Sequence, residues 1–174
     1  MEIGNVCSNF LLKSDHFDNM VIHGYASVFN VVDSQNDLIE KRAFENISPN
    51  NTKLLWQHDS VKPIGVIKVM YEDSYGLRIE AEINNKTVCG KEASELVKQG
   101  AVDGLSIGFC IKDFKYNNQG IRLIKKIDLM EVSIVTFPSN RSASITNFKA
   151  QNTMLFEQSL DKLFLLVQKL TNLK

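Results

Sequence analysis

The segment at residues 104–116, GLSIGFCIKDFKY, decides between two fold classes. Its first five residues match the G-x-S-x-G pattern of the α/β-hydrolase nucleophile elbow, with Ser106 at the serine position. That elbow needs a helix after the serine, whereas the residues after Gly108 alternate as a β-strand does. Those hydrolases also carry their histidine after the serine, but every histidine here precedes Ser106. The segment therefore predicts a strand, and the elbow is rejected.

Six further runs of β-forming residues accompany this segment and are separated by turn residues. In the run GLRIEAEI, at residues 76–83, apolar and polar side chains alternate strictly, which is typical of a half-buried strand. About seven runs at this spacing predict an antiparallel β-barrel or sandwich within an α+β, mainly β, fold class. The other five runs lie at residues 21–29, 53–58, 63–73, 121–127 and 129–137.

Two helices are expected among the strands. Residues 91–98 are helix formers and end before Gly100, a residue suited to a helix C-terminus. A short second helix is predicted near residues 41–47, KRAFENI, and would end at the Ser48 and Pro49 turn.

The composition changes after residue 150, so we divide the chain into a barrel domain at 1–150 and a C-terminal amphipathic helix or tail at 151–174. Apolar side chains recur there at three- and four-residue steps, which predicts one apolar face. This face could pack on the chain's own barrel or on a partner. The stripe consists of Leu160, Leu163, Phe164, Val167 and Leu170, with Lys174 at its end.

Composition excludes several classes of function. The 174 residues include 20 basic and 20 acidic side chains, so no net charge draws the protein to nucleic acid or an anionic membrane. The N-terminus lacks a basic n-region and a long apolar core, so we expect a cytoplasmic protein. Three cysteines, an odd number without a CxxC pair, argue against a disulfide framework or a zinc knuckle. We expect no cofactor and no metal.

Ser106 could still be a nucleophile outside the hydrolase fold, provided that a base lies within hydrogen-bonding reach. His58, at the end of an apolar run, is the best candidate for that base. His16 lies in a polar stretch, and His23 lies inside a predicted strand, where a structural role is expected.

An imidazole base works better with a carboxylate that orients it, and Glu131 offers one. Glu131 interrupts an apolar run, LMEVSIVTF, where a charged group requires a partner. That partner could be the base, or a lysine such as Lys125 or Lys126.

Four stretches, in this order and spacing, resemble the prohead (capsid maturation) proteases of tailed bacteriophages, a family of serine endopeptidases. The resemblance implies a fold similar to herpesvirus assemblin, an antiparallel barrel surrounded by helices. Its "QHD", "LSIGF" and "EVS" motifs fall on His58, Ser106 and Glu131, which implies a catalytic role for each. The stretches are GYASVFNVVDSQNDLIEKRAF, LLWQHDSVKPIG, KQGAVDGLSIGF and LMEVSIVTFPSNRSASI.

The resemblance also carries expectations about the surroundings of the site. Assemblin-like enzymes place an arginine near the oxyanion, and Arg141 is the nearby candidate. Asp33 and Asp37 match acidic positions of the family and could be turn, cap or metal-binding residues. Arg42 stands where the family usually has a glycine.

The function implied is cleavage of the major capsid protein precursor or scaffold protein, and of the protease itself, inside the assembling procapsid in the bacterial cytoplasm. A homodimer is plausible by the same resemblance. Two alternatives stay open: a non-catalytic capsid-assembly or scaffolding protein with the protease fold, and a β-barrel binding module in which His58 and Ser106 lie far apart.

Overall fold

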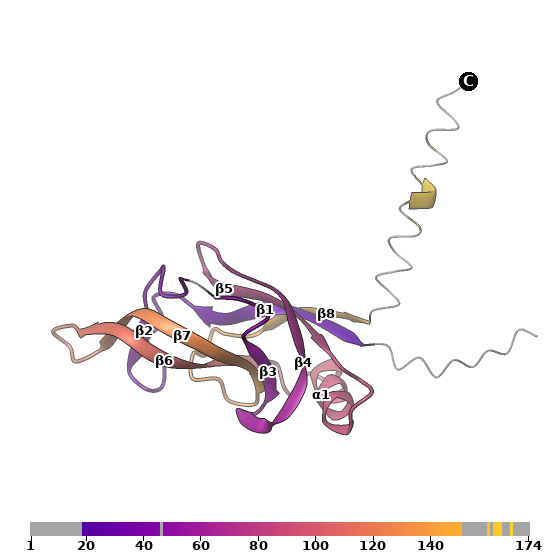
Figure 1. The fold of residues 1–174 in the computed structure, drawn as a ribbon, viewed down its shortest axis with the longest axis horizontal. Helices are drawn as coiled ribbons and strands as arrows, with labels where there is room; N and C mark the ends of the chain where they lie inside the picture. Colours follow the sequence, from indigo (N-terminus) through magenta and orange to yellow (C-terminus); the bar gives the residue numbers. More distant parts are fainter. Residues whose placement is uncertain (1–18, 46, 151–159, 161, 165–167, 169–174) are drawn as a thin grey trace, which may run out of the picture.

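The computed structural model describes residues 19–45, 47–150, 160, 162–164 and 168. Within them the strands and the helix follow one another along the chain as Figure 1 shows. Their bounds are β1 (Met20–Val28), β2 (Asp37–Ile39), β3 (Lys53–Trp56), β4 (Asp59–Glu72), β5 (Gly76–Ile83), α1 (Val88–Lys98), β6 (Gly104–Tyr116), β7 (Arg122–Val135) and β8 (Ile145–Ala150).

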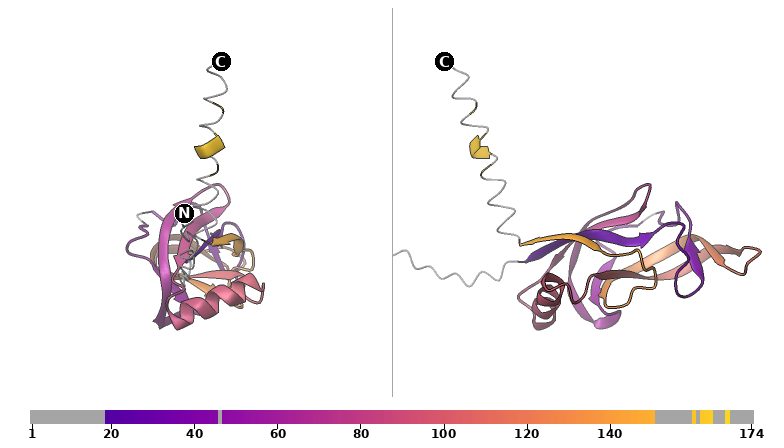
Figure 2. Two further views of the ribbon diagram at one scale, coloured as in Figure 1. Left: turned by 90° about the vertical axis from the view of Figure 1, so that its right-hand side faces the viewer. Right: turned by 180° about the vertical axis from the view of Figure 1, so that it is seen from behind.

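The strands form one curled sheet, open like half of a barrel, in the order β2-β7-β3-β4-β5-β1-β8, and β6 pairs with β7 beside this path (Figures 1 and 2). The mainly β class is confirmed. The prediction of antiparallel pairing holds for most neighbouring strands and is wrong at β7, which pairs in parallel with both β2 and β3. Alternation along a strand indicates its buried face but carries no information about the direction of its neighbour.

Strand boundaries also differ from the prediction. The two runs at residues 121–127 and 129–137 form one continuous strand, β7, which pairs with β6 to make a hairpin that reaches beyond the rest of the sheet (Figure 2). The short strands β2 and β8 were not predicted. Three residues are too few for periodicity to reveal a strand, and β2 exists because β7 provides an edge for it.

The concave side of the sheet holds the core. Along β5 the predicted alternation is confirmed, and its apolar residues are buried while the charged ones are only partly covered. Helix α1 packs against β4 and β5. Its N-cap residue is Thr87, whose side chain accepts a hydrogen bond from the Gly90 N–H, and the chain leaves the helix through Gly100 at a φ of +69°.

The predicted helix near residues 41–47 is wrong. Residues 41–45 form turns, with Arg42 in the left-handed region at a φ of +70°. The carboxylate of Glu72 accepts the backbone N–H groups of Arg42 and Phe44, at 3.1 Å each. A side chain from a distant strand thus satisfies two backbone N–H groups of this turn. The positive φ also explains why a glycine suits position 42.

The prediction of a C-terminal amphipathic helix lies largely outside the described residues. Leu160, Leu163 and Phe164 are helical and exposed, whereas Val167, Leu170 and Lys174 are not described. Among the described helical residues no segment is long and apolar enough to cross a bilayer.

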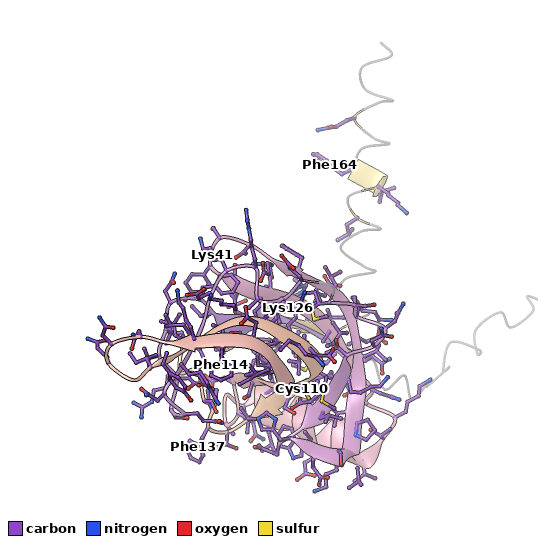
Figure 3. All side chains as sticks on the ribbon, turned by 60° about the vertical axis from the view of Figure 1, so that its left-hand side comes forward. Lys41, Cys110, Phe114, Lys126, Phe137 and Phe164 are labelled. Carbon is purple, nitrogen blue, oxygen red and sulfur yellow. The ribbon has the colours of Figure 1, made fainter. Side chains whose placement is uncertain are left out.

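Replacement of Arg42 by glycine should raise the free energy of unfolding by about 0.5–1 kcal/mol, because the left-handed backbone no longer carries a β-carbon and the hydrogen bond to Glu72 is kept. Lys41→Gly is the matched control in the same exposed turn (Figure 3). Lys41 has no left-handed φ, so its replacement should be neutral or destabilising. Urea denaturation of both variants measures the difference, and a destabilised Arg42→Gly would contradict the strain.

Candidate active site

His58 lies in a two-residue turn between β3 and β4. Trp56 pairs with Asp59 across this turn, and the two residues between them, Gln57 and His58, have φ angles of +54° and +60°. Two consecutive left-handed residues define a primed hairpin turn, which normally takes Asn-Gly because a β-carbon is unfavourable there. His58 also lines a pocket, which is described below. A strained backbone at such a position suggests a functional constraint on the residue.

Contacts with the end of β7 hold the turn in place. The Gln57 backbone N–H donates to the carbonyl oxygen of Ile134 at 3.0 Å. The Gln57 side chain donates through Nε2 to Thr136 Oγ1 at 2.9 Å and accepts the Thr136 N–H through Oε1 at 3.3 Å. Gln57 therefore holds the turn against the end of β7 through these hydrogen bonds. Its position in the sequence did not reveal this role.

Glu131, in β7, pairs with the histidine ring. Its Oε1 lies 2.6 Å from His58 Nδ1, and its Oε2 accepts the Ser133 hydroxyl at 2.8 Å. The carboxylate is only 13% exposed. Because a carboxylate accepts at Nδ1, the ring proton is held there and Nε2 is left as the acceptor.

The alternative lysine partners of Glu131 are not supported. Lys126 lies 3.9 Å from Glu45 instead, and Glu131 is satisfied by His58 and Ser133. Asp59, next to the base, accepts from Lys62 and from the Val61 N–H, and this lowers the pKa of its carboxyl group. Of Glu131 and Asp59, it is therefore Glu131 that binds the His58 ring.

Gly108 gives the carboxylate its space. Gly108 pairs with Glu131 across β6 and β7. A β-carbon at position 108 would collide with Oε1 of Glu131 and lie 2.9 Å from its Cδ. The second glycine of the G-x-S-x-G pattern therefore has a packing role here that is unrelated to a nucleophile elbow.

Ser106 lies on β6, in register with Ser133 of β7, and is 6% exposed. Ser106 and His58 line one open pocket of about 360 Å³. The structure therefore brings the predicted serine, histidine and glutamate into one region, which argues against the binding-module alternative. The other residues lining this pocket are Gln35, Asp37, Ile107, Gly108, Phe109, Ile111, Arg122 and Ser139.

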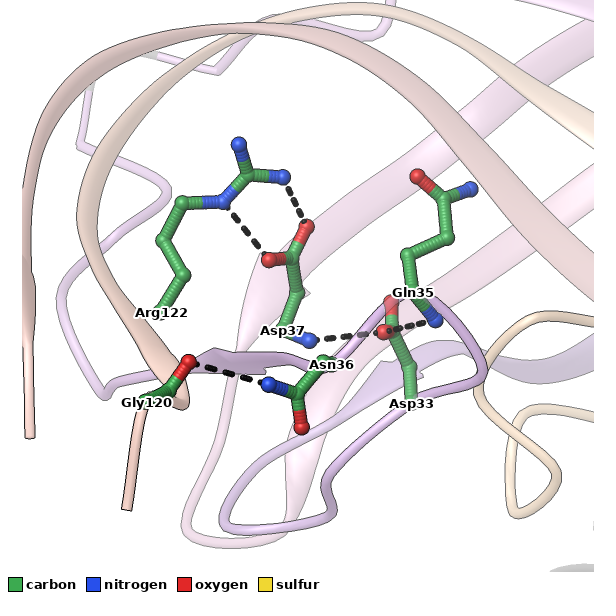
Figure 4. A network of polar contacts seen from close by, with 6 residues as sticks. All are labelled: Asp33, Gln35, Asn36, Asp37, Gly120 and Arg122. Atoms are coloured by element: carbon green, nitrogen blue, oxygen red, sulfur yellow. Dashed lines mark hydrogen bonds and ion pairs between the residues drawn. The ribbon is translucent and has the colours of Figure 1, made fainter.

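An ion pair forms the polar wall of this pocket. Asp37, 4% exposed, accepts two hydrogen bonds from Arg122, at 2.7 Å from Nε and 2.6 Å from Nη2 (Figure 4). The hydrogen bond with Asp37 raises the pKa of Arg122 further above its ordinary value. Asp33 accepts the Gln35 and Asp37 N–H groups, as the turn interpretation expects. Among the described residues no cluster of metal-ligating side chains is found.

Arg141 is exposed in the connection between β7 and β8 and does not line the pocket, whereas Arg122 does. The oxyanion role of Arg141 stays a prediction. His23 lies 3.7 Å from Glu80 on the neighbouring strand β5, a structural position, and His16 is not described.

The two described cysteines are free thiols outside this site. Burial raises the pKa of Cys89, which disfavours the reactive thiolate. Cys110 is exposed on β6 (Figure 3). Its thiol lies 3.6 Å from the sulfur of Met130.

Two solved structures that share this fold are viral proteases. The KSHV protease bound to a hexapeptide phosphonate inhibitor matches with a TM-score of 0.55 and 11% identity, over 76% of this chain and 66% of that one. The bacteriophage T4 capsid assembly protease gp21 matches with a TM-score of 0.52 and 15% identity, over 66% of this chain and 81% of that one. At these identities the similarity shows a shared fold, the one that both of these viral proteases have.

Sequence comparison narrows the class. Residues 8–157 match the caudovirus prohead serine protease family, and the chain belongs to that family. The prohead protease of Enterobacteria phage HK97 is 32% identical over 75% of the chain, and that of Escherichia phage T5 is 30% identical over 75%. A capsid polyprotein of Pseudomonas phage PAJU2 is 30% identical over 86% of the chain, which corresponds to 23% of its own length. The chain spans 60% and 64% of the length of the HK97 and T5 proteins.

The strain at His58 predicts an inverted order of stability for two variants. His58→Ala and His58→Gly both remove the ring and its bond to Glu131, and they differ only by a β-carbon at positive φ. The glycine variant should therefore be the more stable of the two by about 1 kcal/mol, the reverse of the order at an ordinary strand position. Thermal or urea denaturation measures it, and an alanine variant of equal or greater stability would argue against the primed turn.

The Gly108 contact predicts a local loss of geometry without unfolding. In Gly108→Ala the methyl group displaces the Glu131 carboxylate, so the His58 ring and the Ser133 hydroxyl lose their acceptor, and the free energy of unfolding falls by about 1–3 kcal/mol. Nuclear magnetic resonance (NMR) measures this effect. The ring proton on His58 Nδ1 should give a low-field signal in the wild type and none in the variant. Gly120→Ala is the control: a β-carbon there meets no atom but stands on a backbone at a φ of +76°, so this variant should lose stability and keep the signal.

Proposed function

We propose that this chain is a prohead maturation serine endopeptidase in which Ser106 is the nucleophile, His58 the general base and Glu131 the residue that orients the base. The observation that carries the proposal is the 2.6 Å contact between Glu131 Oε1 and His58 Nδ1, at the rim of a pocket that Ser106 also lines. The assemblin-like fold and the family membership support the same activity.

The proposed reaction begins with attack of Ser106 Oγ on the scissile carbonyl carbon. His58 Nε2 takes the Ser106 proton, and the negative charge moves to the carbonyl oxygen. The C–N bond then breaks, His58 returns the proton to the leaving amine, and an ester joins the substrate to Ser106. Water, deprotonated by His58, then attacks this ester; the bond to Ser106 breaks, His58 returns the proton to Ser106 Oγ, and the second product is released as a carboxylic acid.

Glu131 contributes through its charge and its position. The imidazolium formed at His58 lies beside a carboxylate that is largely withdrawn from water, so their attraction is weakened less by solvent than at the surface. The same carboxylate selects the tautomer that leaves Nε2 free to accept a proton. The oxyanion requires donors as well; backbone N–H groups or Arg141 are the candidates, since Arg122 in the pocket already uses Nε and Nη2 to bind Asp37.

The proposed substrates are capsid-related. The similarity to prohead proteases of HK97 and T5 and to a capsid polyprotein supports the capsid precursor or scaffold protein as the substrate class, the chain itself as a further one, and the procapsid in the host cytoplasm as the place of action. Homodimer formation is part of the same proposal.

Ser106→Ala should abolish cleavage of the neighbouring capsid precursor, with a loss in rate of at least about 10⁴-fold, because it removes the atom that forms the ester. The measurement is co-expression with the precursor followed by intact mass of both chains. Ser139→Ala is the matched control, since Ser139 lines the same pocket and has no part in the proposed proton transfer.

The outcomes separate the activity from the alternative. Cleavage that persists in a folded Ser106→Ala variant would contradict Ser106 as the nucleophile. Uncleaved precursor in a folded wild type that assembles with the precursor would favour the non-catalytic assembly protein.

A further inference from the structure

Ser133 joins the base to its carboxylate. Its hydroxyl donates to Glu131 Oε2 at 2.8 Å and accepts the backbone N–H of His58 at 3.1 Å. The residue is fully buried, with no exposed side-chain surface, so it makes these contacts without competition from water. One hydroxyl thus contacts both partners of the His58–Glu131 pair.

The position of Ser133 explains how one residue reaches both groups. In β7 it lies two residues after Glu131, so the two side chains project from the same face of the strand. On one side it pairs with Leu55 of β3, three residues before His58, and on the other with Ser106 of β6. The three segments that carry the proposed catalytic residues therefore meet at Ser133.

The two hydrogen bonds of Ser133 restrict different motions. With Oε1 on the ring and Oε2 on Ser133, both oxygens of Glu131 are held and the carboxylate cannot rotate without losing a bond. The bond from the His58 N–H fixes a residue in a left-handed turn whose backbone is otherwise costly to hold. Catalytic rates are sensitive to displacements of about 1 Å, so this restraint bears on the reaction itself.

We propose that Ser133 is a positioning residue, which aligns Glu131 and His58 for proton transfer from Ser106. The proposal rests on the function proposed above. It assigns no contact with substrate to Ser133, which is buried and does not line the pocket.

Ser133→Ala tests the proposal in the full chain, with a precursor peptide as substrate and rates normalised to the folded fraction. We expect kcat to fall by about 10–100-fold with KM unchanged, because the lost bonds orient the base and not the peptide. The low-field proton signal on His58 Nδ1 should broaden or shift. Ser133→Thr, which keeps the hydroxyl, should restore most of kcat.

Ser94→Ala is the matched control. Ser94 is also a fully buried serine, and its hydroxyl donates to Asn85 beside helix α1, away from the pocket. Its loss should cost stability in the same way and leave kcat and the His58 signal unchanged. Equal kcat in the Ser133→Ala and Ser94→Ala variants would overturn the positioning role.

Hydrogen exchange of the wild type provides a test that needs no variant. The His58 amide should exchange much more slowly than amides of exposed turns, because it donates to a buried hydroxyl. Fast exchange at His58 would overturn the proposal even if Ser133→Ala failed to fold. If Ser106→Ala left cleavage intact, the proposed function would fail. The exchange rate of the His58 amide and the NMR signal of the His58 ring would still test whether Ser133 positions the pair.

Discussion

The pairing of β7 with a strand on each side is the interaction on which the site depends. The parallel pairing with β3 places residues 131–134 beside residues 53–56. The antiparallel pairing with β6 places Ser133 opposite Ser106. Residues 132–135 of β7 are all buried, and a shift of one residue in either register would move Ser133 away from Leu55 or from Ser106. The energy that stabilises the core thus also sets the distances at the surface.

Ser133 and Glu131 of β7 can be withdrawn from water because each has hydrogen-bond partners. Ser133 is fully buried and makes two hydrogen bonds, and Glu131 uses both of its oxygens. A buried polar group without a partner would cost several kcal/mol, so loss of one member exposes the others to that cost. The site is therefore a connected network, in which a backbone turn, a hydroxyl, a carboxylate and a ring constrain one another.

Two adjacent strained residues lie where the network needs them. Gln57 and His58 occupy left-handed conformations that glycine or asparagine would adopt more easily, and contacts with Ile134, Thr136 and Ser133 hold them there. Arg42, also left-handed, does not line the pocket and has no such chemistry. The comparison shows why positive φ alone does not identify a functional residue and why its contacts must be examined.

The sequence by itself determined the mainly β class, most strand positions and the helix at residues 91–98, because side-chain alternation and helix-ending residues are local signals. It also nominated His58, Ser106 and Glu131, through the chemistry of nucleophile and base and through the family resemblance. Tertiary structure decided strand direction, the short strands β2 and β8 and the absence of the helix near residue 42, since these depend on distant partners such as Glu72. Gln57 and Ser133 became recognisable only in the fold, because an ordinary glutamine and serine acquire a role from the neighbours that strand pairing brings to them.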